Sequence, residues 1–176
     1  MRLAHSIEVW LRAALTNRLA EKYGPMGYLN PKIYGHEDAF RRDLSKLNEL
    51  LGDDSPERFV RAFYNKYDNK YPPIWMSAEL MSVGLISKWY DNLGETSLRK
   101  AIAAEVGLHH QVLFSFLRMF SVLRNGAAHH ARIWNRQTAL RGVTIRKPPA
   151  LLESPLLEAD PSCIQYVLVI AAYIVQ

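Results

Sequence analysis

The sequence predicts an all-α protein, a helical bundle of about six or seven helices that forms one domain over residues 1–176. Apolar residues recur every three or four positions along most of the chain, which is the period of an α-helix. Glycines and prolines separate these segments, and no segment alternates apolar and polar residues as a strand does. The chain has 176 residues, of which 49% are apolar, so it is long enough to bury one core.

The N-terminal half is predicted to contain four helices, each with apolar side chains at helical spacing. Gly24 and Gly52 end the first and the second, because glycine is a poor helix former and a good terminator. Ser55, followed by a proline and a glutamate, is a start signal for the third helix. The fourth is strongly apolar and contains Gly84, which predicts a close helix contact there. The expected ranges are about 2–23, 37–51, 55–68 and 74–94.

The C-terminal half is predicted to contain three helices. Their expected ranges are about 97–106, 109–134 and, for a very apolar last helix, 164–176. The prolines of RKPPALLESPLLEADP make residues 137–160 an expected loop. The core stripe of the long helix has steps of 4, 3 and 4 at Phe116, Phe120, Leu123 and Ala127. This stripe would extend to His130 or Ala131 and then to Trp134, and His130 and Trp134 are expected to point inward.

Composition and charge favour a cytoplasmic protein with a polyanionic partner. The single cysteine, Cys163, allows no disulfide within the chain, which fits a reducing compartment. The N-terminus carries early charges and lacks the apolar run of a signal peptide. The apolar stretch at the C-terminus covers 13 residues, which is too short to cross a bilayer. The net charge of +5 favours binding to polyanions such as RNA.

A cluster of cationic and imidazole side chains lies in LRNGAAHHARIWNR, residues 123–136. Its outward row on the expected helix, again with steps of 4, 3 and 4, consists of Asn125, His129, Arg132 and Arg136. Guanidinium groups bind phosphate oxygens through paired hydrogen bonds. An imidazole, with an ordinary pKa near 6.5, exchanges protons at cellular pH. The cluster therefore suits a substrate that contains phosphate.

These groups are also sufficient to cleave RNA without a metal ion. A base removes the proton of the ribose 2′-hydroxyl, an acid protonates the leaving 5′-oxygen, and cations stabilise the charged phosphorane. Arg124 and His129 are five residues apart, so on a regular helix they diverge by about 140°. They can meet at one substrate if the helix loosens near Gly126, if the long arginine wraps round, or if a second copy of the chain supplies another pair.

Two interpretations of the cluster stay open on spacing alone. Basic residues near the C-terminus of a helix also occur because they interact favourably with the helix dipole, which is a purely structural role. The histidine pairs 109–110 and 129–130 have no C-x2-C, H-E-x2-H or carboxylate pattern beside them, and neighbouring residues on a helix diverge by about 100°. We therefore expect neither a metal nor another cofactor.

A family resemblance enters with the motif Arg124-Asn125-Gly-Ala-Ala-His129, which is similar to the R-X4–6-H signature of HEPN domains. LRNGAAHHARIWNR as a whole resembles the RN-x3-HH-x-R-x-WNR string of the Abi-like (abortive infection) family of bacterial phage-defence proteins. IEVWLRAALTNRLAEKYGPMGYLNP resembles that family's helix with E-x3-R, here Glu8 and Arg12, and the YGP–GYL loop after it. PPIWMSAELMSVGLISKWYDNL resembles its Pro-Trp-Met segment and S-x-G-x-x-S helix. The resemblance covers about residues 3–136.

The resemblance implies an all-α HEPN-like fold and a metal-independent endoribonuclease that acts as a toxin-like effector of abortive infection. HEPN domains of this lineage also resemble those of the RNA-guided type VI CRISPR nucleases, which cut RNA with the same motif. Carried over by position, Arg124 and His129 are the catalytic pair and Asn125 is the accompanying polar residue. The implied partners are RNA and a second copy of the chain, and the resemblance also admits an antitoxin or an associated guide RNA. Longer members carry a region before the E-x3-R helix, which this chain is expected to lack.

Supporting roles are expected for the remaining cationic and acidic residues near the motif. Glu8 and Arg12, four residues apart, form either an ordinary helix ion pair or, as the resemblance implies, a pair that orients Arg124 or His129. The residues expected to hold flanking phosphates or brace the site are His130, Arg132 and Arg136. The rival function is a non-catalytic module that binds RNA or a protein partner through the same cationic face.

Overall fold

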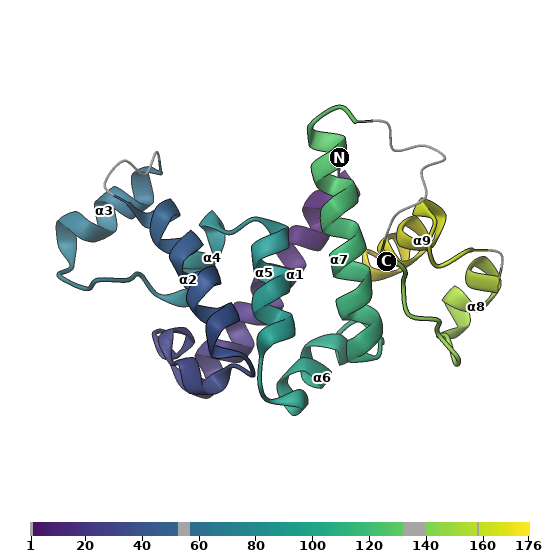
Figure 1. Ribbon diagram of the computed structural model, residues 1–176, viewed down its shortest axis with the longest axis horizontal. Coiled ribbons are helices and arrows are strands. Elements are labelled where there is room, and N and C mark those ends of the chain that lie inside the picture. The colour runs from purple at the N-terminus through teal and green to yellow at the C-terminus, as the bar shows by residue number, and fades with distance from the viewer. Residues whose placement is uncertain (1, 53–56, 132–139, 158) are drawn as a thin grey trace. The chain divides into compact units, whose positions relative to one another are not determined.

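The computed structural model describes residues 2–52, 57–131, 140–157 and 159–176, and these are helical throughout their regular structure (Figure 1). No strand occurs in these ranges; one isolated antiparallel bridge joins Tyr34 and Leu93. The elements in chain order are α1 (Arg2–Tyr23), the 3-10 helices η1 (Gly27–Leu29) and η2 (Pro31–Ile33), α2 (Glu37–Leu51), α3 (Arg58–Lys66), α4 (Ile74–Leu80), α5 (Val83–Asn92), α6 (Thr96–Ala104), α7 (His110–Ala128), α8 (Ala150–Leu157) and α9 (Ile164–Ile174). The all-α prediction is confirmed, although more helices are present in these ranges than the six or seven expected.

The chain divides into two compact units. Unit 1 comprises Met1–Trp10 and Arg99–Gln176, and unit 2 comprises Leu11–Leu98. The first turns of α1 therefore belong to unit 1, whereas the rest of this helix belongs to unit 2. Residues of α1 therefore contribute to both units. The helix has the bounds that the sequence predicted.

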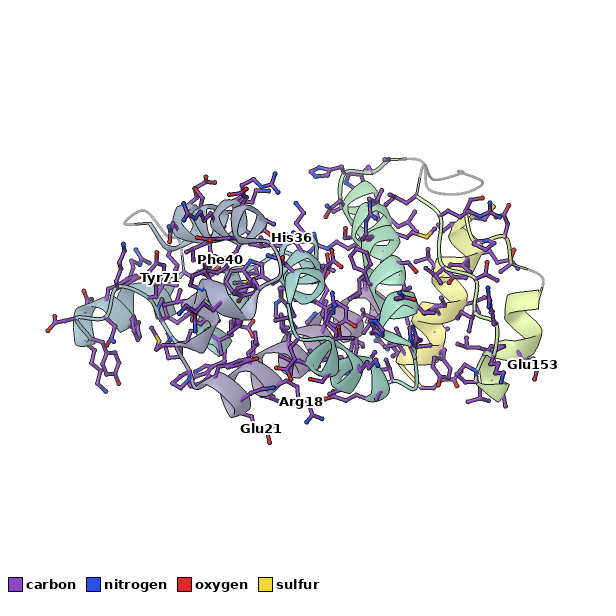
Figure 2. All side chains as sticks on the ribbon, turned by 60° about the horizontal axis from the view of Figure 1, so that its bottom comes forward. Arg18, Glu21, His36, Phe40, Tyr71 and Glu153 are labelled. Atoms are coloured by element: carbon purple, nitrogen blue, oxygen red, sulfur yellow. The ribbon has the colours of Figure 1, made fainter. Side chains whose placement is uncertain are left out.

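Unit 2 is organised around the buried indole of Trp89 on α5. The rings of Tyr28, Tyr34 and Phe40 surround it, with centroids 5.7, 5.8 and 6.2 Å from that of Trp89. Phe40, labelled in Figure 2, comes from α2, which packs against both α4 and α5. The Tyr28 hydroxyl donates to the carbonyl of Pro72 at 2.7 Å, and burial raises the pKa of this phenol to about 12. The aromatic cluster thus joins the η1 turn to α2 and α5.

Unit 1 is built on α7, whose first turns are apolar and buried. Phe116 and Phe120 stack with ring centroids 5.5 Å apart, and α9 packs against α7 and α8. The extended segment before α8 is held between α7 and α9: the Val143 N–H donates to Ser115 Oγ at 3.1 Å, and the Tyr166 hydroxyl donates to the Val143 carbonyl at 2.6 Å. The buried residues of α7 end at Phe120, and its polar C-terminal turns continue from there.

The apolar segment 74–94, predicted to be one helix, is two helices. The chain leaves the helical conformation at Met81 (ψ 133°), and the Ser82 side chain then accepts a hydrogen bond from the Leu85 N–H at 3.3 Å as the N-cap of α5. A serine side chain competes with the helix for backbone N–H groups, which apolar periodicity does not reveal. Gly84 accordingly lies in the first turn of α5 and not in a helix interior.

Two further helix predictions were wrong at their bounds. The long helix expected to reach residue 134 ends at Ala128, for a reason given below. The expected loop 137–160 contains α8, which begins directly after Pro149. Proline often marks a loop, but its fixed φ also suits the start of a helix, where no backbone N–H partner is needed.

Candidate functional site

The C-terminus of α7 carries the R-X4-H motif and ends in a helix-capping turn. His130 has a φ of 54°, in the left-handed region that non-glycine residues seldom occupy. Its N–H donates to the Ala127 carbonyl at 3.2 Å, and the Ala131 N–H donates to the Gly126 carbonyl at 2.9 Å. This pair of hydrogen bonds is the Schellman arrangement, with His130 in the position usually held by glycine. The chain therefore leaves the helix axis directly after His129.

Asn125 and His129 lie exposed on the last turn of α7. His129 is the C-cap residue, with its N–H donating to the Asn125 carbonyl at 3.1 Å, and its ψ of 19° already departs from the helical value. Arg118 and Val122 precede them on the same face at helical spacing, and both are exposed. The end of α7 thus presents an amide, an imidazole and an apolar side chain to solvent.

The Arg124 side chain joins α7 to the first turns of α1 within unit 1. Its Nε donates to Oε1 of Glu8 at 2.8 Å; the Glu8 side chain is 11% exposed and that of Arg124 37%. A carboxylate that is nearly buried requires a charged hydrogen-bond partner, so this contact fixes the direction of the arginine. Because it is made through Nε, the Nη edge of the guanidinium can face a phosphate.

Arg12, the second residue of the E-x3-R pattern, binds backbone in unit 2. Its Nε donates to the Ala78 carbonyl at 3.1 Å and its Nη2 to the Met81 carbonyl at 3.0 Å. These carbonyls lie at the C-terminal end of α4, where the last carbonyls of a helix are open to further donors; the Ala78 carbonyl also accepts from the Met81 N–H at 3.1 Å. Arg12 therefore helps to end α4 at the break before α5, a structural role that the sequence did not suggest.

The structure differs from the sequence prediction in the direction of His130. His130 and Ala127 are exposed, whereas both were placed on an inward stripe. For His130 the reason is the left-handed turn, which takes the chain out of the 3.6-residue period. Ala127 precedes this turn and lies in the part of α7, residues 121–128, in which no residue is buried. The helix does loosen, as one route to a shared site requires, but at His129 and His130 and not at Gly126, which remains inside α7.

Part of the predicted site lies outside the described residues. Arg132 and Arg136, expected to hold flanking phosphates, and Trp134 fall in the range 132–139. The described part of the predicted site therefore consists of Glu8, Arg12 and the end of α7. No residue type in Ala-Ala-His-His-Ala signals a helix stop, since glycine and asparagine are absent there, so the capping role of His130 could not be found from sequence.

A metal centre and a membrane span are two other features that the ranges 2–52, 57–131, 140–157 and 159–176 could contain. In these ranges no group of three or more histidine, cysteine, aspartate or glutamate side chains could hold a metal ion. None of the helices found there combines the length and the apolar character needed to cross a membrane.

Comparison with known proteins addresses the family directly. Neither the curated proteins nor the solved structures contain a match to this sequence. The model of the Abi-like protein family matches residues 1–135, which include α1, the Ser82–Asn92 region and the complete motif at the end of α7. This match spans more than half of the 176 residues, so the chain belongs to the family of Abi-like proteins.

Proposed function

We propose that this Abi-like protein is a metal-independent endoribonuclease that acts in the cytoplasm as an effector of abortive infection. The observation that supports this most is the arrangement at the end of α7. Arg124 is held by the nearly buried carboxylate of Glu8, while Asn125 and His129 of the same R-X4-H motif are open to solvent. A fixed guanidinium beside accessible proton-transfer and hydrogen-bonding groups is suited to phosphate chemistry.

The proposed reaction is transesterification within the RNA strand. The His129 imidazole removes the proton of a ribose 2′-hydroxyl, and the 2′-oxygen then forms a bond to the adjacent phosphorus. The Arg124 guanidinium stabilises the negative charge of the phosphorane, and Asn125 orients the imidazole or the ribose. The bond from phosphorus to the 5′-oxygen breaks, an imidazolium protonates that oxygen, and a 2′,3′-cyclic phosphate remains on the upstream fragment. No oxidant, reductant or metal takes part.

A homodimer would supply both proton transfers at once. The motif of one chain contributes His129 as a single base, and the partner subunit's His129 would serve as the acid. Exposed apolar side chains beside the motif support an interface that a second copy of the chain would cover. Val122, two residues before Arg124, is 47% exposed, and Val9, next to Glu8, is 49% exposed. We therefore expect Val122→Glu to convert a dimer into a monomer in light scattering and to lower cleavage in parallel.

The direct test uses purified protein and RNA in the presence of EDTA. Wild-type protein is expected to cleave RNA and to leave 2′,3′-cyclic phosphate ends. His129→Ala should lower the rate by at least about a hundredfold, because general acid–base catalysis typically contributes that much. His5→Ala is the matched control, since His5 is an exposed histidine on α1 outside the motif.

Each outcome separates the enzyme from the rival function. Cleavage that persists in His129→Ala contradicts the assignment of the site. RNA that stays intact with the wild-type protein, while it still binds, favours the non-catalytic module that binds RNA or another protein through the same face.

A further inference from the structure

The end of α3 and the segment that joins it to α4 in unit 2 contain two Asn-Lys-Tyr triplets separated by Asp68. They are Asn65-Lys66-Tyr67 and Asn69-Lys70-Tyr71, in the sequence YNKYDNKY. Figure 1 shows this segment as the long blue connection between α3 and α4, and Tyr71 is labelled in Figure 2. The proposed catalytic cluster does not include any of these residues, so their chemistry needs a separate explanation.

Large aromatic side chains are exposed along this segment. Tyr64, Tyr67 and Trp75 have relative exposures of 38%, 47% and 50%, and Tyr71 is half-buried. Single exposed aromatic residues are common on protein surfaces. Here three of them, with the half-buried Tyr71 as a fourth aromatic residue, fall within the twelve residues from Tyr64 to Trp75, and exposed apolar groups gathered in this way commonly mark a binding surface.

Packing and hydrogen bonding hold the rings of Tyr64 and Tyr67 in place. The buried Phe63 contacts the rings of Tyr64 and Tyr67, with centroids 5.4 and 5.1 Å away. The Tyr64 hydroxyl donates to the Lys70 carbonyl at 3.2 Å, which ties the second triplet back to α3. Rings that are already ordered lose little conformational entropy when a ligand stacks on them.

A cation accompanies each triplet tyrosine. Lys66 Nζ lies 5.5 Å from the centroid of the Tyr67 ring, and Lys70 Nζ lies 5.5 Å from that of Tyr71. Arg58 and Arg61 on α3 are also exposed. Against these four cations, residues 57–75 contain two carboxylates, Glu57 and Asp68, so the patch is net positive.

We propose that the aromatic patch, defined as Tyr64–Tyr71 together with Trp75, binds single-stranded RNA. In each triplet the tyrosine ring stacks on a base, the lysine neutralises the neighbouring phosphate, and the asparagine amide reaches a base edge or a ribose hydroxyl. Aromatic rings interleaved with cations form the usual platform for single strands, whose bases are free to stack. This proposal rests on the proposed function in one respect, namely that RNA is the substrate.

The lysines beside the tyrosine rings favour RNA over a protein partner. Protein interfaces are enriched in aromatic residues but depleted in lysine, whereas here each triplet places a lysine beside its ring. A double-stranded RNA would contact the lysines through its phosphates, yet its paired bases are not available for stacking. The patch therefore fits a flexible single strand best.

The test measures binding of the full chain with His129→Ala present, so that the probe is not cleaved. The probe is a fluorescein-labelled oligouridylate of about 12 nucleotides, followed by fluorescence anisotropy, with a duplex of equal length in parallel. Tyr67→Ala with Tyr71→Ala should weaken binding of the single strand by roughly 25-fold, since each lost stack costs at least about fivefold. Tyr67→Phe with Tyr71→Phe keeps both rings and should restore binding to within about twofold, because stacking does not need the hydroxyl.

Salt dependence tests the lysines. Lys66→Gln with Lys70→Gln should reduce the slope of log K against log salt by about 1.4, which is about 0.7 for each phosphate contact with a single strand. The matched control is Lys32→Gln with Lys100→Gln, which removes the same charge from two exposed lysines outside the patch and should leave the slope unchanged.

The outcomes separate this inference from the proposed function. Unchanged binding of the oligouridylate by the alanine variant overturns the patch as an RNA site, even if the wild-type protein cleaves RNA, and leaves a protein as its partner. An equal loss for single strand and duplex overturns the stacking mechanism. Weaker single-strand binding, together with a wild-type protein that never cleaves RNA, supports the patch and contradicts the nuclease.

Discussion

Glu8 and Arg124 are separated by 116 positions in the chain, yet they are joined by a hydrogen bond of 2.8 Å. Glu8 contributes a nearly buried carboxylate from α1, and Arg124 comes from the last turns of α7. The contact links two patterns of the sequence, E-x3-R and R-X4-H, through their first residues. It makes Glu8 a positioning residue for the arginine that we propose to bind the scissile phosphate.

Glu8→Gln is therefore expected to lower kcat for RNA cleavage by about tenfold to a hundredfold with little change in KM. The neutral amide holds the guanidinium less firmly, and small errors in position are costly at a reaction centre. Thermal unfolding should change little, since a contact with an arginine that is more than a third exposed contributes only about 1 kcal/mol. Glu21→Gln, on the exposed side of the same helix, is the control. Tighter RNA binding in Glu8→Gln would contradict a positioning role and indicate that Glu8 competes with phosphate.

His130→Gly is expected to raise the stability of the protein by about 1 kcal/mol. Glycine adopts the left-handed φ of 54° without the steric cost of a β-carbon. Chemical denaturation measures the change, and His130→Val should destabilise because a β-branched residue tolerates this conformation poorly. Cleavage of RNA should persist in His130→Gly. A loss of cleavage in this variant, with activity retained in His129→Ala, would reassign the proton transfer to His130.

Glu95 gives unit 2 a stability that depends on pH. Hydrogen bonds from Lys22, Ser97 and Tyr23 lower the pKa of its carboxyl to about 2, from the usual 4.5. The folded state therefore binds this proton less readily than the unfolded state does. The stability that the carboxylate contributes is complete above pH 4.5 and is lost as the pH falls toward 2.

Urea unfolding of wild type and Glu95→Gln at a series of pH values measures this contribution. The variant is expected to be less stable at pH 7, and the gap should close as the pH falls from about 4.5 toward 2. Because all other groups are common to both proteins, their titration cancels in the difference. A gap that is constant with pH would show that the carboxylate is not the source.

Two glycine substitutions in unit 1 should change stability in opposite directions. A Cβ added at Gly142 would lie 2.3 Å from Cε1 of Tyr166, so Gly142→Ala should destabilise by about 1–3 kcal/mol. A Cβ at Gly126 would be 3.8 Å from the Cβ of Ala131, an ordinary contact, and Gly126→Ala within α7 should stabilise by about 0.5–1 kcal/mol. Differential scanning calorimetry distinguishes them. Equal effects would mean that the Tyr166 ring moves aside without cost.

The sequence alone was sufficient to predict features that depend on neighbouring residues, such as helix bounds and short motifs. The bounds of α1 and α2 were predicted correctly because an apolar period of 3.6 residues ends at a glycine in each case. The R-X4-H motif and its likeness to the Abi-like family were also readable, and the family match over residues 1–135 confirms the latter. These features depend on residues that lie close together in the chain.

Contacts between distant residues decided the rest. Arg12 binds the carbonyls at the end of α4, and Glu8 sets the direction of Arg124. The end of α7 has a local cause instead, the left-handed turn at His130. A helical period continues through all of these points, so the pattern of apolar residues alone cannot show them. The physical reason is that a helix ends, or an arginine turns, wherever a hydrogen-bond partner elsewhere in the fold lowers the free energy more than one further helical turn would.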